Sequence, residues 1–285
     1  MASVIYKDWY AIRRGRPDIT DYLIHWTHGQ MMDGQWCSPF HVLKTIAACG
    51  YLRPSFAPKQ RATVGGSENT IKGNHPAVCF TEQPLDAFLK SCRLLPGRYK
   101  LYGIAVHKWH IHTYRGRPAI YGDESLLHEL PDDQKYLWVR YNPVPERTLG
   151  GYPIDWTHER EWRVKTASYS YGPLGVGPEE GVPLLLPPVS YPGSDKPVLA
   201  LPRFLVSNRS EMEDLKEELR KLPTYRGANA VLKYYFDIAP QAVVIPLDEV
   251  SAHLEDGDQR YARLETLPYG EIDPSIELPP PESYL

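Results

Sequence analysis

His-Glu-Arg-Glu-Trp-Arg-Val, at positions 158–164, is the stretch that says most about the fold of this chain. Side chains alternate along a β-strand, so as a strand it would place Glu159, Glu161 and Arg163 on one face. Buried carboxylates are costly unless they are paired. This face is therefore either exposed to solvent or built for chemistry.

The composition is that of an ordinary globular protein and argues against several classes of protein. The net charge of −3 and the pI of about 6.4 give the molecule no overall attraction to nucleic acid or anionic membranes. We find no apolar run that could span a bilayer and no signal-peptide core, which predicts a cytoplasmic protein without membrane association. The four cysteines never approach Cys-x-x-Cys spacing, so we expect reduced thiols.

The local patterns predict an α+β fold. Ser38 and Pro39 are typical of a helix start and Gly50 of its end, with apolar positions on one face between them. Helices are expected early and strands in the middle of the chain, which favours α+β over regular alternation. The expected strands are 22–26, 77–81, 101–107, 118–121, 136–141, 158–165 and 242–246, and further helices are expected from about Pro84 and over 211–222.

The chain shows no internal repeat and no clear linker, so we expect a single domain over residues 1–267 with its core at about 20–170. Residues 172–202 carry eight prolines and five glycines, which predicts a long irregular excursion that could act as a lid. A C-terminal helix and strand are expected within 208–250. The Pro-rich tail, 268–285, is expected to be extended.

Several familiar sites are missing from the sequence. It contains no Gly-x-x-x-x-Gly-Lys phosphate loop and no Gly-x-Ser-x-Gly elbow. The glycines of 172–181 lack the strand and helix that a Rossmann fingerprint needs. On a strand, His110 and His112 would point the same way as two metal ligands could, but no third ligand stands at suitable spacing. We therefore expect no metal site.

Two groups of segments carry a family resemblance. The first is Leu23-Ile24-His25-Trp26-Thr27-His28 followed by a helix ending in Ala48-Cys49-Gly50-Tyr51-Leu52, which resembles the opening of DarT-type ADP-ribosyltransferases. The second resembles the AbiGi-type abortive-infection family. It comprises Val78–Leu85, Tyr102–Trp109, Arg117–Tyr121 and Glu159–Arg163. The resemblance covers residues 20–165 and depends on the order of the segments.

The resemblance implies a split-sheet ADP-ribosyltransferase core with NAD as substrate. Cleavage of the nicotinamide–ribose bond develops positive charge, which a carboxylate stabilises while accepting the nucleophile's proton. Glu161 is similar to the family's catalytic glutamate, and Glu159 would position the nucleophile. The implied NAD-binding residues are His25 for the ribose, Thr27 and His28 in support of it, and Tyr51 and Tyr121 for stacking on nicotinamide.

One feature departs from the family pattern. DarT-type enzymes carry an arginine in the region corresponding to 79–85, where this chain has Cys-Phe-Thr-Glu-Gln-Pro-Leu. Arg93, Arg61 or Arg53 could replace it. The departure bears on the prediction that the acceptor is a nucleobase more than on the predicted fold.

Three functions remain open. The first is transfer of ADP-ribose to a macromolecule by a toxin or phage-defence effector, with DNA or RNA favoured as acceptor and protein as an alternative. The second is an inactive binding module of the same fold, such as an antitoxin partner. The third is a hydrolase that uses Glu159 and Glu161, about 7 Å apart on one strand, as an acid/base pair. Without chemistry, Glu161 would simply pair with Arg163, and Cys79 would be a buried thiol rather than a nucleophile.

Overall fold

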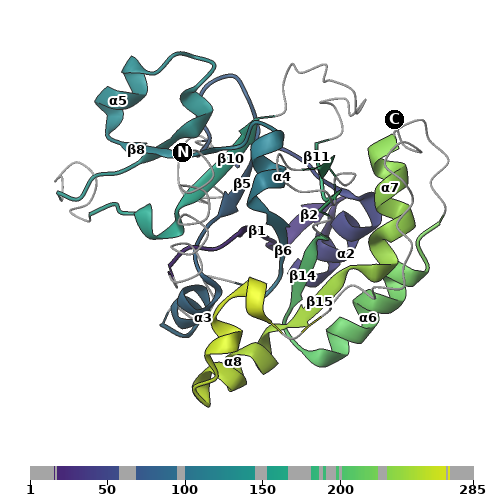
Figure 1. Ribbon diagram of the computed structural model, residues 1–285. Coiled ribbons are helices and arrows are strands. Elements are labelled where there is room, and N and C mark those ends of the chain that lie inside the picture. The colour runs from purple at the N-terminus through teal and green to yellow at the C-terminus, as the bar shows by residue number, and fades with distance from the viewer. Residues whose placement is uncertain are drawn as a thin grey trace, which may run out of the picture.

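The computed structural model describes residues 16, 18–57, 69–94, 100–144, 153–165, 181–185, 189–190, 197–198, 201–223, 230–267 and 269. At the centre of this part of the chain lies a seven-stranded mixed sheet (Figure 1). Its strands, in spatial order, are β15 (Val243–Pro246), β14 (Arg203–Val206), β6 (Gly103–His107), β1 (Tyr22–Trp26), β5 (Ala77–Thr81), β10 (Glu161–Lys165) and β7 (Arg117–Pro118).

The sheet has one weak joint in its middle. Strands β1 and β6 pair through five residue pairs, and so do β5 and β10. Between β1 and β5 the register is the single pair Ile24↔Thr81. The neighbouring strands are antiparallel except β14 and β15, which are parallel and joined through helices. The sheet is therefore two halves whose backbone ladders meet through one residue pair, while side-chain packing and the bond from His25 to Cys79 also cross the joint.

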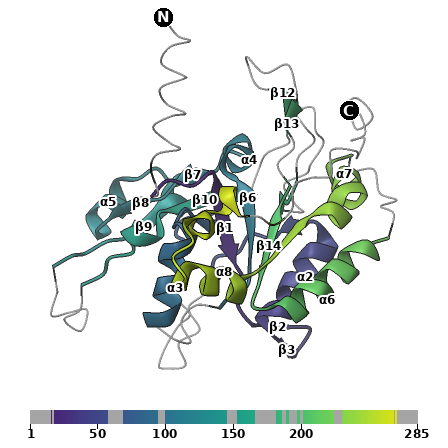
Figure 2. The same ribbon diagram turned by 60° about the horizontal axis from the view of Figure 1, so that its bottom comes forward.

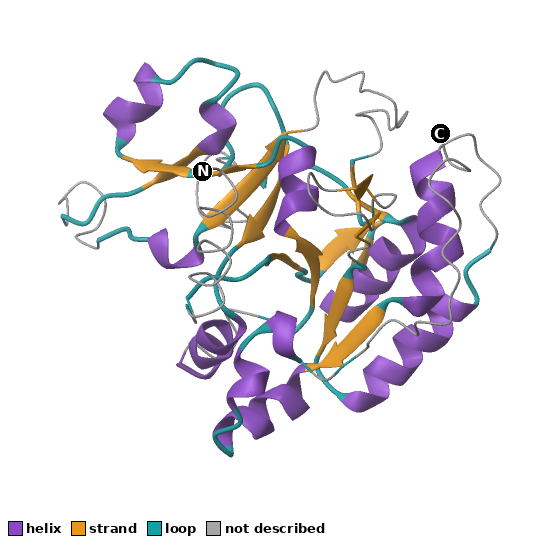
Figure 3. Cartoon of the chain, in the orientation of Figure 1, coloured by secondary structure: helices purple, strands orange, loops and turns teal. Residues whose placement is uncertain are grey.

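Helices cover both faces of the sheet (Figure 3). The helices are α2 (Pro39–Cys49), α3 (Leu85–Leu94), α4 (Lys108–Thr113), α5 (Glu124–Glu129), α6 (Arg209–Arg220), α7 (Ala230–Ile238) and α8 (Leu247–Glu255). Four two-stranded ribbons complete the described structure: β2 (Gln30–Met32) with β3 (Gln35–Cys37), β4 (Tyr51–Leu52) with β11 (Val182–Pro183), β8 (Ile120–Gly122) with β9 (Trp138–Arg140), and β12 (Val189–Ser190) with β13 (Pro197–Val198). The β2–β3 hairpin leads directly into α2 (Figure 2). None of the described helices has both the length and the hydropathy to cross a bilayer.

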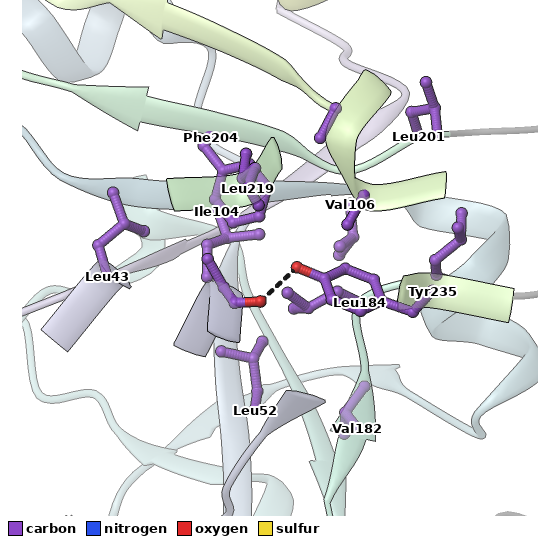
Figure 4. Close-up of a cluster of buried hydrophobic side chains, with 14 of the residues drawn as sticks. Leu43, Leu52, Ile104, Val106, Val182, Leu184, Leu201, Phe204, Leu219 and Tyr235 are labelled. Atoms are coloured by element: carbon purple, nitrogen blue, oxygen red, sulfur yellow. Dashed lines mark hydrogen bonds between the residues drawn. The ribbon is translucent and has the colours of Figure 1, made fainter. Parts of the chain in front are cut away.

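The two larger apolar cores lie on the two faces of the sheet, and a small third one consists of Ile71, Ala77, Tyr136 and Leu137. The largest one packs α2, α6 and α7 against residues such as Leu23, Phe80 and Phe204. Within it the Tyr235 hydroxyl donates a hydrogen bond of 2.7 Å to the carbonyl of Ala47, so α7 is joined to α2 (Figure 4). The second core packs α3 and α8 against the opposite face. Each of the two larger cores draws on residues from both ends of the chain.

Several expected elements are confirmed at their expected positions. Strands β1 and β5 have the expected bounds. Helix α2 begins after Ser38, whose side chain accepts from the backbone N–H of His41, and it ends at Gly50 with φ 77°. The mixed α+β class is likewise what the sequence indicates.

Other expectations are wrong. Residues 157–159 form a 3₁₀ turn and Arg160 adopts φ 45°, so the strand begins only at Glu161. Residues 135–137 also form a 3₁₀ turn before β9. Helices are not concentrated early, because α6, α7 and α8 all follow residue 208. His110 and His112 lie on α4 and not on a strand. The consecutive residues His110 and Ile111 are both buried, which fits one face of a helix and not the alternating burial of a strand.

The Pro/Gly-rich excursion is described only in part. Residues 182–183 pair with β4, and Val182, Leu184 and Leu185 are buried in the core. This part of the excursion is therefore packed structure. The remainder of 172–202, with the exception of β12, β13 and residues 181 and 201–202, lies outside the described residues, as does the tail apart from Tyr269.

Candidate functional site

Glu161 stands at the start of β10, directly after a tight turn. The hydroxyl of Thr81 donates to the carbonyl of Glu159, and the backbone N–H of Glu82 lies 3.3 Å and 3.2 Å from the carbonyls of Glu159 and Arg160. The Arg160 guanidinium donates to Asp18. Contacts with β5 and with the N-terminal segment therefore hold the turn, including the left-handed backbone at Arg160, which a non-glycine residue adopts at some cost.

The Glu161 carboxylate forms a bidentate ion pair with Arg163. Nε of Arg163 lies 2.8 Å from Oε1 of Glu161, and Nη2 lies 3.3 Å from Oε2. The arginine side chain is 5% exposed and the glutamate side chain 14%. The sequence predicts this ion pair for the case in which Glu161 has no catalytic role, but as an exposed pair, whereas the pair is buried.

The backbone of Glu161 is held by the segment that precedes it. Its N–H donates to the Tyr121 hydroxyl at 2.8 Å, and its carbonyl accepts from the N–H of Ala119 at 2.7 Å. Burial, foremost, raises the pKa of Tyr121 to about 12. Tyr121 therefore contributes a neutral hydroxyl that orients the start of β10.

Cys79 lies directly opposite Arg163 across the β5–β10 pair. Burial, and then the charge of Glu161, raise the pKa of its thiol well above the ordinary value. A thiol is a nucleophile only as the thiolate. The geometry thus favours a buried thiol over a nucleophile at this position.

His25 lies next to the single pair that joins β1 and β5. Its Nδ1 is 2.8 Å from the carbonyl of Cys79, and its ring meets that of Phe80 edge-on, with 5.9 Å between centroids. Burial lowers the pKa of His25, which favours the neutral ring with Nδ1–H as donor. The side chain thus bonds to β5 where pairing with the β1 backbone stops.

The sheet separates His25 from Glu161. Ile24, Thr81 and Glu161 stand side by side on three neighbouring strands and so share one face. His25 is one residue further along, on the opposite face, together with Phe80. The structure therefore brings both residues to the middle of the sheet but does not point them into one cavity.

Glu159 does not share a face of a strand with Glu161. It ends the 3₁₀ turn, two residues before the strand begins. The two carboxylates are therefore not adjacent same-face positions of one strand, although the charges of both act on Cys79 and Tyr121.

The remaining predicted ligand residues are dispersed. Thr27 is buried, and its hydroxyl lies 3.2 Å from the carbonyls of both Pro39 and Tyr102. His28 follows it and is exposed. Tyr51 lies on β4, and its hydroxyl accepts from Arg53 at 3.2 Å. Of these three residues, Thr27 is buried, Tyr51 is half-buried and His28 is exposed.

The structure places an arginine other than these three candidates opposite the 79–85 stretch. Arg53 bonds Tyr51, Arg93 binds Ser251 and Glu255 on α8, and Arg61 lies outside the described residues. The guanidinium that borders the 79–85 stretch is that of Arg163, opposite Cys79. Only the register of β5 against β10 reveals this, since the two residues are far apart in sequence.

A second polar cluster lies at the end of β5. Glu82 accepts from Nζ of Lys108 at 2.6 Å and from the indole N–H of Trp162 at 2.8 Å. Both charged side chains are about one-fifth exposed, at 17% and 20%. Because both carboxylate oxygens are bonded, we interpret this cluster as a structural tie between β5, β10 and α4.

Among the residues that the structure describes, no group of three His, Cys, Asp or Glu side chains is placed to hold a metal ion. Comparisons of the chain with protein-family models, with curated proteins and with solved structures gave no significant match.

Proposed function

We propose that the chain is an NAD-dependent ADP-ribosyltransferase that modifies a macromolecule, with nucleic acid as the favoured acceptor. Its role would be that of a toxin or phage-defence effector. Glu161 is the acidic residue that stabilises the oxocarbenium-like ribose and accepts the proton of the nucleophile.

The observation that supports this proposal most is the joint between β1 and β5. The resemblance to DarT-type and AbiGi-type proteins implies a split sheet, and here the backbone ladder between the two halves consists of the pair Ile24↔Thr81. His25 lies next to this pair on β1. Glu161 is the first residue of β10 and stands opposite Thr81, the β5 member of the pair. We infer that NAD lies beside this joint, on the face of the sheet that carries Glu161, while His25 lies at the joint on the opposite face.

The position of Glu161 also agrees with the role. It is the first residue of its strand, it retains 14% exposure, and its backbone N–H and carbonyl are both fixed. A carboxylate that is held in place before the substrate arrives stabilises a developing charge without reorganisation.

A second function is favoured by one specific contact. Arg163 occupies both oxygens of the Glu161 carboxylate, so the group is neutralised where the reaction would need a free charge. A binding module of the same fold that retains NAD affinity without turnover, for example an antitoxin partner, is consistent with this pair.

The test is incubation of the purified chain with labelled NAD and, separately, with protein lysate, RNA, single-stranded DNA and duplex DNA. Glu161→Gln is the active-site variant, because the amide oxygen still accepts from Arg163 while the charge is lost. Glu129→Gln, an exposed position on α5, is the matched control. Melting temperatures verify that both variants fold.

Label transfer to one acceptor class that Glu161→Gln abolishes and Glu129→Gln retains would support the transferase and identify its acceptor. NAD binding without transfer or nicotinamide release would favour the binding module. Full transfer by a folded Glu161→Gln would remove Glu161 from the mechanism. A chain that does not bind NAD would contradict both readings.

A further inference from the structure

The two charged contacts of the Glu161 carboxylate are both with Arg163, and the Cys79 thiol also bonds it. Arg163 is itself anchored elsewhere. Its Nη1 donates to the carbonyls of Tyr136 and Trp138, at 2.6 Å and 2.9 Å. Both carbonyls belong to residues 117–144, the segment that also holds the backbone of Glu161 through Ala119 and Tyr121. One buried guanidinium therefore connects this segment to the carboxylate.

We propose that Arg163 is the positioning residue for Glu161 and that segment 117–144 sets the place of the carboxylate through it. This inference rests on the proposed function in assigning Glu161 a reaction to serve. Arg163 itself does not contact the substrate. It determines where the Glu161 oxygens stand when the substrate arrives.

The geometry of the guanidinium explains why arginine occupies this position. Its planar fork supplies Nε–H and Nη2–H to the two carboxylate oxygens and Nη1–H to two carbonyls at the same time. A rotation of Glu161 away from this fork would leave a cation that is 5% exposed without its counter-ion. Such a loss is strongly unfavourable, so the carboxylate has one preferred position.

The variants that test this are Arg163→Lys and Arg163→Gln. Lysine keeps the charge but offers a single point of contact in place of the fork, and glutamine is close in size but neutral. The control is Arg140→Gln on β9, in the same segment, where the arginine pairs with Glu124 and is 30% exposed. Melting temperatures identify the variants that fold.

Two measurements are made on each folded variant. The first is kcat and KM for nicotinamide release from NAD. The second, which needs no turnover, is the extent of carbodiimide-and-amine labelling of Glu161, read by peptide mass spectrometry. For Arg163→Lys we expect kcat to fall about 100-fold, the order of magnitude for a catalytic group displaced by about 1 Å, with KM within about twofold. Labelling of Glu161 should rise severalfold in both Arg163 variants and stay unchanged in Arg140→Gln.

Wild-type labelling of Glu161 in a folded Arg163 variant would overturn the inference, and so would wild-type kcat. Unfolding of both Arg163 variants would assign Arg163 to stability alone and would overturn it as well. If the unaltered chain shows no NAD turnover, the proposed function fails, and labelling alone decides whether Arg163 holds the carboxylate. The two failures are therefore distinguishable.

Discussion

At the scale of single residues, burial decides what an ion pair does. Exposed pairs contribute little to stability, about 0–1 kcal/mol. Removal of one partner from a buried pair costs about 3–5 kcal/mol, because a charge is left without its counter-ion. Glu161 and Arg163 belong to the second class, with side chains 14% and 5% exposed. Their sequence spacing suggests the pair, but only the packing of residues 136–138 over Arg163 makes it buried.

His110 predicts a pH dependence of stability. It is buried on α4, with Nε2 3.0 Å from the carbonyl of Pro183, and burial lowers its pKa to about 4. An unfolded histidine has a pKa of about 6.5, so between these values the unfolded chain binds the extra proton. The contribution of His110 to the free energy of unfolding is fully present above about pH 6.5 and is lost as the pH falls towards 4. At pH 4.5 the loss is roughly 2 to 3 kcal/mol.

Urea unfolding at pH 7 and pH 4.5 measures this effect in wild type, His110→Gln and His112→Gln. Glutamine does not titrate but still offers an N–H to Pro183, so His110→Gln should lose less stability on acidification by that amount. His112 is exposed on the same helix, and its variant should behave like wild type. The same acid sensitivity in both variants would contradict the assignment.

At the scale of elements, Gly50 at the end of α2 and Gly34 in the turn between β2 and β3 are a matched pair of glycines. Gly50 and Gly34 have almost the same φ, 77° and 79°. A Cβ at Gly34 would meet nothing within 4 Å, whereas at Gly50 it would lie 2.6 Å from the ring of Tyr235. Left-handed backbone costs a non-glycine residue about 1–2 kcal/mol, and overpacking adds about 1–3 kcal/mol.

We therefore expect Gly34→Ala to lower the free energy of unfolding by about 1 to 2 kcal/mol and Gly50→Ala by about 2 to 5 kcal/mol. Chemical denaturation of the two variants at one pH provides the comparison. Equal losses would mean that Tyr235 yields freely, which would contradict its packing in the core and its bond to Ala47.

The elements that the sequence predicts well are those whose determinants are local. Helix α2 needs only Ser38, Pro39 and Gly50, and these are visible in the sequence. The turn at 157–160 depends instead on Thr81 and Glu82, which bind its carbonyls from another strand. No local pattern contains that contact, so Glu159 is misplaced by sequence reasoning. The face on which His25 lies, opposite Glu161, likewise follows from the register of β1 against β5.

At the scale of the whole molecule, the two larger cores join parts of the chain that are far apart in sequence. Phe204 and Leu215 pack in the same cluster as Leu23 and Phe80, and Ile245 packs with Ile24 on the other face. Full burial of one such side chain contributes about 1.5–3 kcal/mol, against about 5–15 kcal/mol for a whole domain. We therefore expect that the described residues up to 165 and those from 201 onwards are stable only together.

Cooperative unfolding follows, and the tryptophans make it measurable. All seven precede residue 163, whereas α6, α7 and α8 all follow residue 208. Fluorescence therefore reports the first part of the chain, and far-UV circular dichroism also reports the last. We expect the two urea transitions to coincide.

Leu215→Ala on α6 should shift both by the same free energy, about 2 to 5 kcal/mol, although no tryptophan lies near it in sequence. The exposed Glu213→Ala on the same helix should shift neither. A Leu215→Ala variant that moves the dichroism transition alone would show that the C-terminal helices fold as a separate unit.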